Sequence, residues 1–254
     1  MSGYSQLVGP GMTLVIGFLT ALAPSLPAQD SPPPARTLIH AGRLIDGISE
    51  QARADQGILI EGDRVVRLGP YRAVAAEAGD ATPLDLSSFT VLPGLIDNHT
   101  HILLQGDITA QDYDEQLLKE SIPYRTIRAT VAARTALLNG FTTLRDLETE
   151  GAMYADVDVR NAINRGIIPG PRMFVATRAF SATGMYPLSG YSWELRVPEG
   201  VQIVDGADNI RQAVREQVKY GADWIKVYVD RRYYLAPDGR LRSWVNFTDE
   251  ELKA

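Results

Sequence analysis

Three short segments after residue 36 alternate between apolar and polar positions in the manner of β-strands: residues 37–47, 57–69 and 85–92. The second segment contains two strand-like runs separated by residues 61–63, whose sequence Glu-Gly-Asp favours a hairpin turn. Helical periodicity is weak throughout this region. We therefore predict that residues 37–92 form a small β-sandwich-like unit.

Beyond residue 92, strand-like and helical segments alternate, and three times a helical segment ends in a glycine that precedes an apolar strand-like run. The predicted strands are residues 95–104, 141–147, 172–178 and 222–230, and the predicted helices are residues 122–139, 154–165 and 208–220. Such alternation is typical of βα units around a parallel sheet. Because four strands are half of a (β/α)8 barrel, we predict an α/β fold class, with an incomplete TIM-like barrel of about four βα units over residues 93–254.

The spacing of apolar residues in two of these helices indicates which side of each helix faces the core. The expected buried positions are Ile127, Val131, Ala132, Thr135 and Leu138 in the first helix and Ile210, Ala213, Val214 and Val218 in the third. A long segment rich in Gly, Pro and aromatic residues, 181–205, precedes the third helix. We expect it to form a loop over the mouth of a site, with an ordered spacer as the alternative interpretation.

The first 36 residues differ in character from the rest. Residues 12–22 (MTLVIGFLTAL) form an apolar run followed by small residues and prolines, as in a secretory signal peptide, although no Lys or Arg precedes the run. The run is shorter than the roughly 20 residues that a membrane span needs. We expect residues 1–28 to be a signal peptide and residues 29–36 a Pro-rich linker. This predicts a periplasmic or secreted protein with no stable membrane span after processing.

Composition restricts the chemistry that the chain can perform. The net charge is -6 and no basic stripe occurs, so no nucleic-acid partner is expected. The absence of cysteine excludes disulfides, thiolate metal ligands and cysteine nucleophiles. The sequence has no GxSxG elbow, GxxxxGK[ST] phosphate loop or HExxH helix. Any histidine chemistry must use His40, His99 or His101, the three histidines of the chain.

The motif at residues 97–101 (DNHTH) is the strongest local signal for chemistry. Side chains two residues apart share a face of a strand. The imidazoles of His99 and His101 can therefore converge on one metal ion, with Asp97 behind them as an outer partner. Two polar side chains at a strand end, without a metal, are the alternative interpretation of the same pattern.

The segment VLPGLIDNHTH closely resembles the first-strand signature of the amidohydrolase superfamily. GRLIDG and GDRVVRLG resemble its sandwich portion, GFTTLRDLE resembles its second strand, and GADWIKVYVD resembles a fourth strand whose carboxylated lysine bridges two metals. The resemblance covers residues 37–254 and is closest to imidazolonepropionase-like and Xaa-Pro dipeptidase-like members. It implies a β-sandwich made from both chain ends, a distorted (β/α)8 barrel, and hydrolysis of an amide-type C–N bond in a dipeptide, N-acyl amino acid or cyclic amide.

The resemblance also implies a site for two divalent metal ions, usually zinc, in the complete protein. His99 and His101 match the first-strand ligands. Lys226 matches the bridging lysine, which must act as a carbamate because an ammonium group has no lone pair. Tyr228 lies two residues further along the same strand face, so its phenol is a candidate for polarising the scissile carbonyl; packing inside the barrel is the alternative. His40 is expected to be structural.

The family pattern further requires histidines after strands five and six and an aspartate after strand eight, none of which this sequence supplies. Thr248 and Glu251 match a capping box close to the last residue, so we expect the natural fold to continue and expect no amidase turnover from these 254 residues alone. The alternatives are a catalytically inactive fragment and a non-enzymatic metal- or ligand-binding chain. The open edges of half a barrel would favour pairing with another chain, including a homo-oligomer. Arg145 and Asp146 lie at the end of the second strand, on the side where barrel active sites form. They are expected to form internal ion pairs that hold loops, and a role in the active site is the alternative.

Overall fold

The computed structural model describes residues 34–106 and 110–254, which divide into two compact units. One unit contains residues 34–44 and 49–91, and the other contains residues 45–48 and 92–254 apart from the gap. Within the described ranges, no helix is both long enough and apolar enough to cross a membrane. The predicted signal peptide and most of the predicted linker lie outside the described residues.

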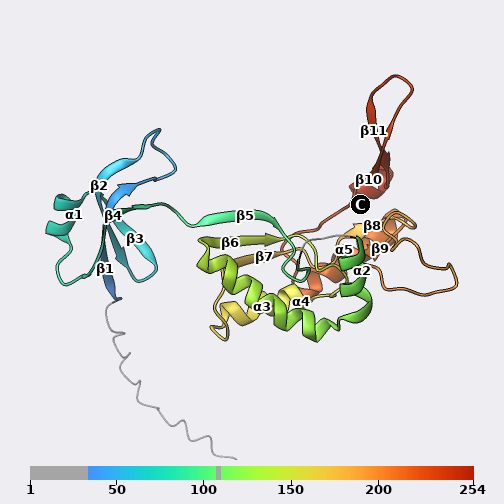
Figure 1. Cartoon of the computed structure of the whole chain (residues 1–254), viewed down its shortest axis with the longest axis horizontal. Helices are drawn as coiled ribbons and strands as arrows, with labels where there is room; N and C mark the ends of the chain where they lie inside the picture. Colours follow the sequence, from blue (N-terminus) through green and yellow to red (C-terminus); the bar gives the residue numbers. More distant parts are fainter. Residues whose placement is uncertain (1–33, 107–109) are drawn as a thin grey trace, which may run out of the picture. The chain divides into compact units, whose positions relative to one another are not determined.

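The first unit is a four-stranded sheet with a short helix packed on it (Figure 1). The strands lie in the order β3-β2-β1-β4, with β1 and β4 parallel and the other pairs antiparallel. The elements are β1 (Arg36–Leu44), β2 (Arg53–Glu61), β3 (Arg64–Pro70), α1 (Tyr71–Glu77) and β4 (Thr82–Val91). The predicted hairpin turn is confirmed between β2 and β3. Leu38 and Leu59 of the sheet pack against Val74 and Ala78. In the described residues a helix, not the second sheet of a sandwich, therefore covers this sheet.

The second unit is built on a parallel sheet with the order β5-β6-β7, and α3 and α4 lie along one of its faces (Figure 1). The elements are β5 (Leu95–Thr100), α2 (Ala110–Lys119), α3 (Ile122–Leu138), β6 (Phe141–Asp146), α4 (Ala155–Asn164), β7 (Arg172–Val175), β8 (Phe180–Ser181), β9 (Gln202–Ile203), α5 (Ala207–Tyr220), β10 (Asp230–Leu235), β11 (Leu241–Val245) and α6 (Asp249–Lys253). The predicted α/β alternation is confirmed here. Within the described ranges the strands do not close into a barrel.

Close packing at its first residues positions β5. The chain enters this strand through Gly94, where a Cβ atom would lie 2.0 Å from Oγ1 of Thr142, so only glycine allows the approach to β6. The N–H of Leu95 donates to the carbonyl of Gly140 at 2.8 Å. These contacts fix the register of β5 on β6 and thereby the position of its carboxyl end, where the histidine motif lies.

The sequence predicted the range of α3 correctly but not its buried face. Ser121 caps the helix by accepting from the N–H of Tyr124 at 3.3 Å. The buried side chains are Arg125, Ala129 and Ala133, whereas the expected core residues Ile127, Val131 and Leu138 are 68%, 63% and 67% exposed. Small alanines allow the helix backbone to lie close to the sheet, where Leu144, Met173 and Val175 complete the core.

The predicted fourth strand, residues 222–230, is wrong as a regular strand. Before Asp230, which begins β10, only Val227 of this range forms a bridge, to Phe180, while the N–H groups of Asp223 and Trp224 both donate to the carbonyl of Val175. The segment bends at Asp223 because its carboxylate accepts from the N–H of Val175 at 2.9 Å and pairs with Arg160 at 2.7 Å. On α5, Ile210 and Ala213 are buried as expected, but Val218 is 59% exposed.

The last part of the chain contains a hairpin that the sequence analysis did not predict. Strands β10 and β11 pair in antiparallel fashion and extend away from the rest of the unit (Figure 1). The capping box that precedes α6 is confirmed, since Thr248 accepts from the N–H of Glu251 and Glu251 accepts from the N–H of Thr248. The segment 181–205 is mainly loop, with two-residue strands β8 and β9 near its ends.

Candidate metal centre and active site

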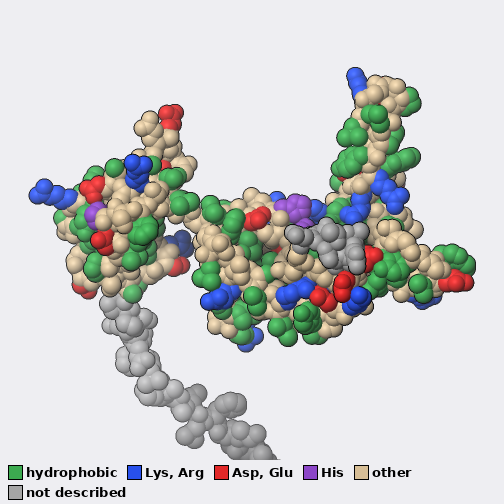
Figure 2. Space-filling view, viewed as in Figure 1, with side chains coloured by type: hydrophobic (Ala, Val, Ile, Leu, Met, Phe, Trp, Pro, Cys, Tyr) green, Lys and Arg blue, Asp and Glu red, His purple; other side chains and the backbone are tan. Residues whose placement is uncertain are grey.

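The two histidines of the DNHTH motif lie together at the carboxyl end of β5. Their ring centroids are 5.2 Å apart with an interplanar angle of 53°. Imidazole atoms reach the surface of this unit (Figure 2). Partial burial lowers the pKa of His99, and the nearby charge of Lys226 lowers it further. His99 therefore favours the neutral imidazole, the form that donates a lone pair to a metal ion.

Lys226 and Tyr228 lie on the segment that follows α5, next to β8. The N–H of Phe180 donates to the carbonyl of Lys226, and the N–H of Tyr228 donates to the carbonyl of Phe180, both at 2.9 Å. Nζ of Lys226 lies 5.1 Å from the centre of the Tyr228 ring. The charge of Lys226 acts on both His99 and Glu148. The structure thus brings all four residues that the sequence analysis selected into one region.

One nitrogen of His101 faces a pair of glutamates that follow β6. Nδ1 of His101 is 3.3 Å from the backbone carbonyl of Glu148 and 3.7 Å from Oε1 of Glu150. One ligand atom from each of these three residues lies within 4.8 Å of the other two, so the group could itself hold a cation. Both glutamates are buried, Glu148 completely.

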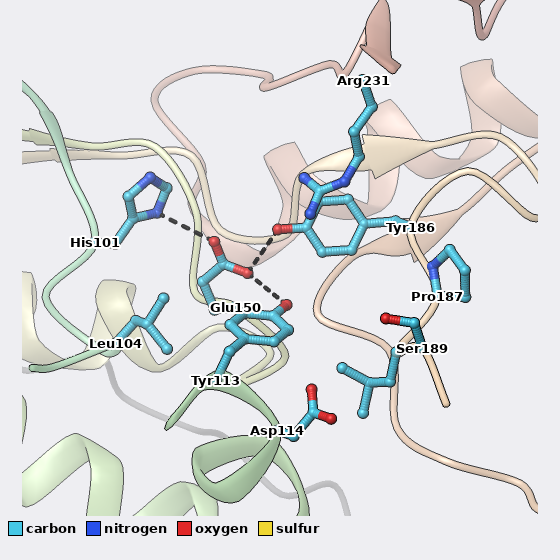
Figure 3. A pocket seen from close by; sticks show the side chains of 10 residues that line it. His101, Leu104, Tyr113, Asp114, Glu150, Tyr186, Pro187, Ser189 and Arg231 are labelled. Atoms are coloured by element: carbon cyan, nitrogen blue, oxygen red, sulfur yellow. Dashed lines mark hydrogen bonds and ion pairs between the residues drawn. The ribbon is translucent and has the colours of Figure 1, made fainter. Parts of the chain in front are cut away.

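Three tyrosine hydroxyls donate to this glutamate pair, and Figure 3 shows the two that donate to Glu150. Tyr113 and Tyr186 donate to Oε2 of Glu150 at 2.8 and 3.1 Å, and Tyr228 donates to Glu148. Burial raises the pKa of Glu148 well above its ordinary value, and the charge of Glu150 raises it further. Burial also raises the pKa of Tyr186 to about 12 and strongly raises the pKa of Tyr228. The tyrosines therefore remain protonated donors at neutral pH.

A buried arginine holds the glutamate segment in place from α3. Arg125 is 2% exposed and donates to the carbonyls of Leu103, Thr149 and Glu150 at 3.0, 3.1 and 2.8 Å. Glu150 has φ +49, a left-handed conformation that a residue with a side chain adopts at some cost. The arginine contacts stabilise this turn, which directs the Glu150 carboxylate toward His101.

Two other residues that the sequence analysis named, Arg145 and Asp146, have different partners from those expected. Asp146 is fully buried and joins the ends of two strands, since its Oδ1 accepts from Thr100 Oγ1 and from the N–H of Ile102. Arg145 donates to the carbonyl of Asn98 and lies 5.2 Å from the Trp224 ring centre. The expectation of internal ion pairs for Arg145 and Asp146 is therefore wrong among the described residues.

The carboxylate of Asp97 accepts from the N–H of His99 at 2.9 Å and so supports the backbone of the motif. His40 lies in the other unit, where Nε2 is 2.8 Å from Asp55 and the ring stacks on Tyr71 at 3.7 Å. His40 thus has structural partners of its own.

A pocket of about 350 Å³ opens beside the tyrosine and glutamate cluster (Figure 3). It is lined by side chains from the segment after β5, from α2, the glutamate segment, the long loop and β10, among them His101, Tyr113, Glu150, Tyr186 and Arg231. The expectation that segment 181–205 helps to enclose a site agrees with this lining, because Tyr186, Pro187, Leu188 and Ser189 belong to it. A pocket of this size suits a small molecule.

Sequence reasoning missed the glutamates, the buried arginine and two of the tyrosines. Glu148 and Glu150 had a detectable signal, since they alternate directly after a predicted strand, at the edge where barrel sites form. Arg125 lies in a helix among apolar residues and Tyr186 in an irregular loop. No local pattern indicates that either one contacts the glutamate segment.

Comparison with known proteins shows which family the chain belongs to. Residues 90–254, more than half of the chain, match the Amidohydrolase family. The chain belongs to the amidohydrolase family. Ochratoxinase from Aspergillus niger is 29% identical over 240 residues, which are 85% of this chain and 46% of that protein. Imidazolonepropionase from Paracoccus denitrificans is 33% identical over 122 residues, 46% of this chain and 29% of that protein.

Solved structures of amidohydrolases have the same fold. A Xaa-Pro dipeptidase with bound methionine in the active site matches with a TM-score of 0.68 and 30% identity, over 86% of this chain and 52% of that one. Aspergillus niger ochratoxinase matches with a TM-score of 0.67 and 26% identity, over 87% of this chain and 52% of that one. The chain spans about half the length of these relatives.

Proposed function

We propose that this chain carries metal-binding and substrate-binding residues of a divalent-metal-dependent hydrolase that cleaves an amide-type C–N bond. The observation that carries the proposal is the approach of His99 and His101, whose rings lie 5.2 Å apart at the carboxyl end of a parallel strand. Barrel enzymes build their active sites at this end of their strands. Membership of the amidohydrolase family supports hydrolysis as the reaction.

The residues present fit a divalent ion of the zinc type. His101 engages the carbonyl of Glu148 through Nδ1, which leaves Nε2 as the lone-pair donor, and such an outer contact orients metal-binding histidines. The lowered pKa of His99 favours its neutral form. Lys226, as a carbamate, would add anionic oxygens between two ions. A bound ion of this kind polarises a carbonyl and lowers the pKa of water.

The alternative cation position among His101, Glu148 and Glu150 is less suitable. Oε2 of Glu150 already accepts from two tyrosines, and Nδ1 of His101 already faces a backbone carbonyl. An ion there would have to displace these contacts. We therefore assign the two glutamates to orienting His101 and not to holding the ion.

Two phenols are the candidates for acting on a substrate carbonyl. Tyr228 keeps its proton because burial raises its pKa, so it can donate to a developing oxyanion when it leaves Glu148. The hydroxyl of Tyr186 lies 3.5 Å from that of Tyr228 and offers a second donor. Tyr228 is therefore proposed to polarise the scissile carbonyl, with Tyr186 beside it.

The substrate class follows from the relatives. Dipeptides, N-acyl amino acids and cyclic amides all contain an amide-type C–N bond, and the names of the relatives include a dipeptidase. We extend the proposal to a periplasmic or secreted location on the basis of the apolar run at residues 12–22. The competing function, a metal- or ligand-binding chain without turnover, is favoured by the histidine inventory, because only three histidines are present.

The test is a hydrolysis assay on a panel of these three substrate classes, with chelator and with added zinc. It is run on the protein as expressed from its gene, as wild type and as H101A. We expect zinc-dependent hydrolysis by the wild type and its loss in H101A. Hydrolysis that survives chelation, or that persists in H101A, contradicts the proposed function.

A further inference from the structure

The pocket beside the proposed centre contains Arg231, an arginine that has no acidic partner among the described residues. The guanidinium carbon of Arg231 lies 3.4 Å from the centre of the Tyr186 ring and 5.3 Å from that of Tyr228. Among the described residues no ion pair or side-chain hydrogen bond involves Arg231, although seven other arginines form ion pairs: Arg36, Arg64, Arg67, Arg128, Arg160, Arg211 and Arg242. Its donors are therefore available to a ligand.

The aromatic contacts fix how the guanidinium is presented. A cation is attracted to the face of an aromatic ring, and stacking leaves the N–H groups at the edge of the guanidinium directed sideways. Figure 3 shows this group over Tyr186 on the side of the pocket away from Asp114. An edge with parallel N–H donors matches the two oxygens of a carboxylate.

The other charges in the pocket specify where an anion binds. Of the described residues that line the pocket, Asp114 and Glu150 are the acidic ones, and Arg231 is the one arginine or lysine. Asp114 also accepts from Tyr191 at 2.9 Å, so it remains an acceptor that repels a carboxylate. A substrate with a free carboxylate therefore binds with that group toward Arg231 and away from the acidic side chains.

The position of Tyr186 connects this arginine with the proposed chemistry. The ring of Tyr186 lies under Arg231, and its hydroxyl reaches Oε2 of Glu150, which lies beside His101. The ring of Tyr186 and the carboxylate of Glu150 therefore connect a carboxylate bound by Arg231 with His101. We propose that Arg231 binds the free carboxylate of the substrate and so selects N-acyl amino acids or dipeptides over uncharged amides. This inference rests on the proposed function for its substrate class.

The test is an NMR titration of the purified chain with N-acetyl-L-leucine and with its uncharged counterpart N-acetyl-L-leucinamide, in the presence of chelator. We expect the acid to bind the wild type roughly tenfold more tightly than the amide, as a charge-assisted hydrogen bond would provide. The preference should disappear in R231Q. R232Q is the matched control, because Arg232 is the exposed neighbour on β10 that does not line the pocket. It should keep the preference. Thermal unfolding curves verify that both variants fold.

Three outcomes overturn the inference: equal or undetectable binding of both ligands by the wild type, a preference retained in R231Q, or a preference lost equally in R232Q. The assay needs neither metal nor turnover. A carboxylate preference that depends on Arg231, in a protein that hydrolyses nothing, would uphold this inference while contradicting the proposed function.

Discussion

Nδ1 of His101 lies 3.3 Å from the backbone carbonyl of Glu148. This contact joins the end of β5 to the segment after β6 and turns the opposite nitrogen, Nε2, away from the glutamates. The carboxylate of Glu150, 3.7 Å from Nδ1, reinforces the same orientation. The segment that contains Glu148 and Glu150 therefore orients His101, the proposed metal ligand.

Glu150 should influence metal affinity although we do not assign it as a ligand. In E150Q the carboxylate charge beside His101 is lost while the side chain keeps its size. We expect the zinc affinity to fall roughly 10- to 100-fold, the usual effect of losing an outer partner of a metal-binding histidine. Competition with a chelating dye measures this. E194Q, at an exposed loop position, is the control. An affinity for zinc that is equal in E150Q and wild type contradicts the supporting role.

Replacement of Arg125 should destabilise the second unit strongly. R125M leaves three buried carbonyls without their donor, so the free energy of unfolding should fall by roughly 3–5 kcal/mol. Chemical denaturation measures the change. Arg134 is exposed on the same helix, and R134M should change stability by no more than about 0.5 kcal/mol. Similar stabilities for the two variants would show that Arg125 does not hold the segment.

Tyr228 should affect both stability and rate. In Y228F the buried Glu148 carboxyl loses its donor, which should cost about 1–3 kcal/mol of stability. In a hydrolytically active product of the gene, kcat should fall on the order of 100-fold with a smaller change in KM, because the lost hydrogen bond strengthens only as charge develops on the carbonyl oxygen. Y220F on α5 is the control. An unchanged kcat would leave Tyr228 with a packing role alone.

Stability should depend on pH through Asp156. Burial raises the pKa of Asp156 from 3.8 to about 7, against the N–H donors of Thr177 and Val157 and the charge of Arg160. The folded protein then binds a proton that the unfolded chain releases, so the free energy of unfolding falls as pH rises through this interval. Denaturation at several pH values should show a shallower slope in D156N than in D158N, an exposed position of the same helix. Equal slopes would contradict the prediction.

Local sequence patterns were sufficient to predict β5, the strand at whose carboxyl end the histidine motif lies, and the range of α3. The period-2 spacing of His99 and His101 predicted two neighbouring imidazoles, because that geometry depends only on the strand itself. The buried face of α3 could not be predicted in this way. Its larger apolar residues, such as Ile127, are exposed, while Ala129 packs on the sheet. Side-chain size at the interface with the sheet decided which face of α3 is buried. The spacing of apolar residues does not indicate that size requirement.

The orientation of Glu150 and the bend at Asp223 depend on contacts between segments that are distant in the sequence, so local patterns could not predict them. Glu150 points toward His101 only because its backbone takes a left-handed turn that Arg125 holds from α3. Residues 222–230 had the composition of a strand, but Asp223 binds the end of β7 and bends the chain. Both features need the tertiary structure before they can be recognised.

The most direct test of the account is the zinc content of the purified protein after dialysis, determined by elemental analysis for wild type, H99A, H101A and H40A. His40 lies in the other unit and serves as the matched imidazole control. We predict bound zinc in the wild type and in H40A, and its loss in H99A and H101A. A wild-type protein that holds no zinc, or an H101A protein that holds as much as the wild type, would contradict the assignment of these histidines as metal ligands.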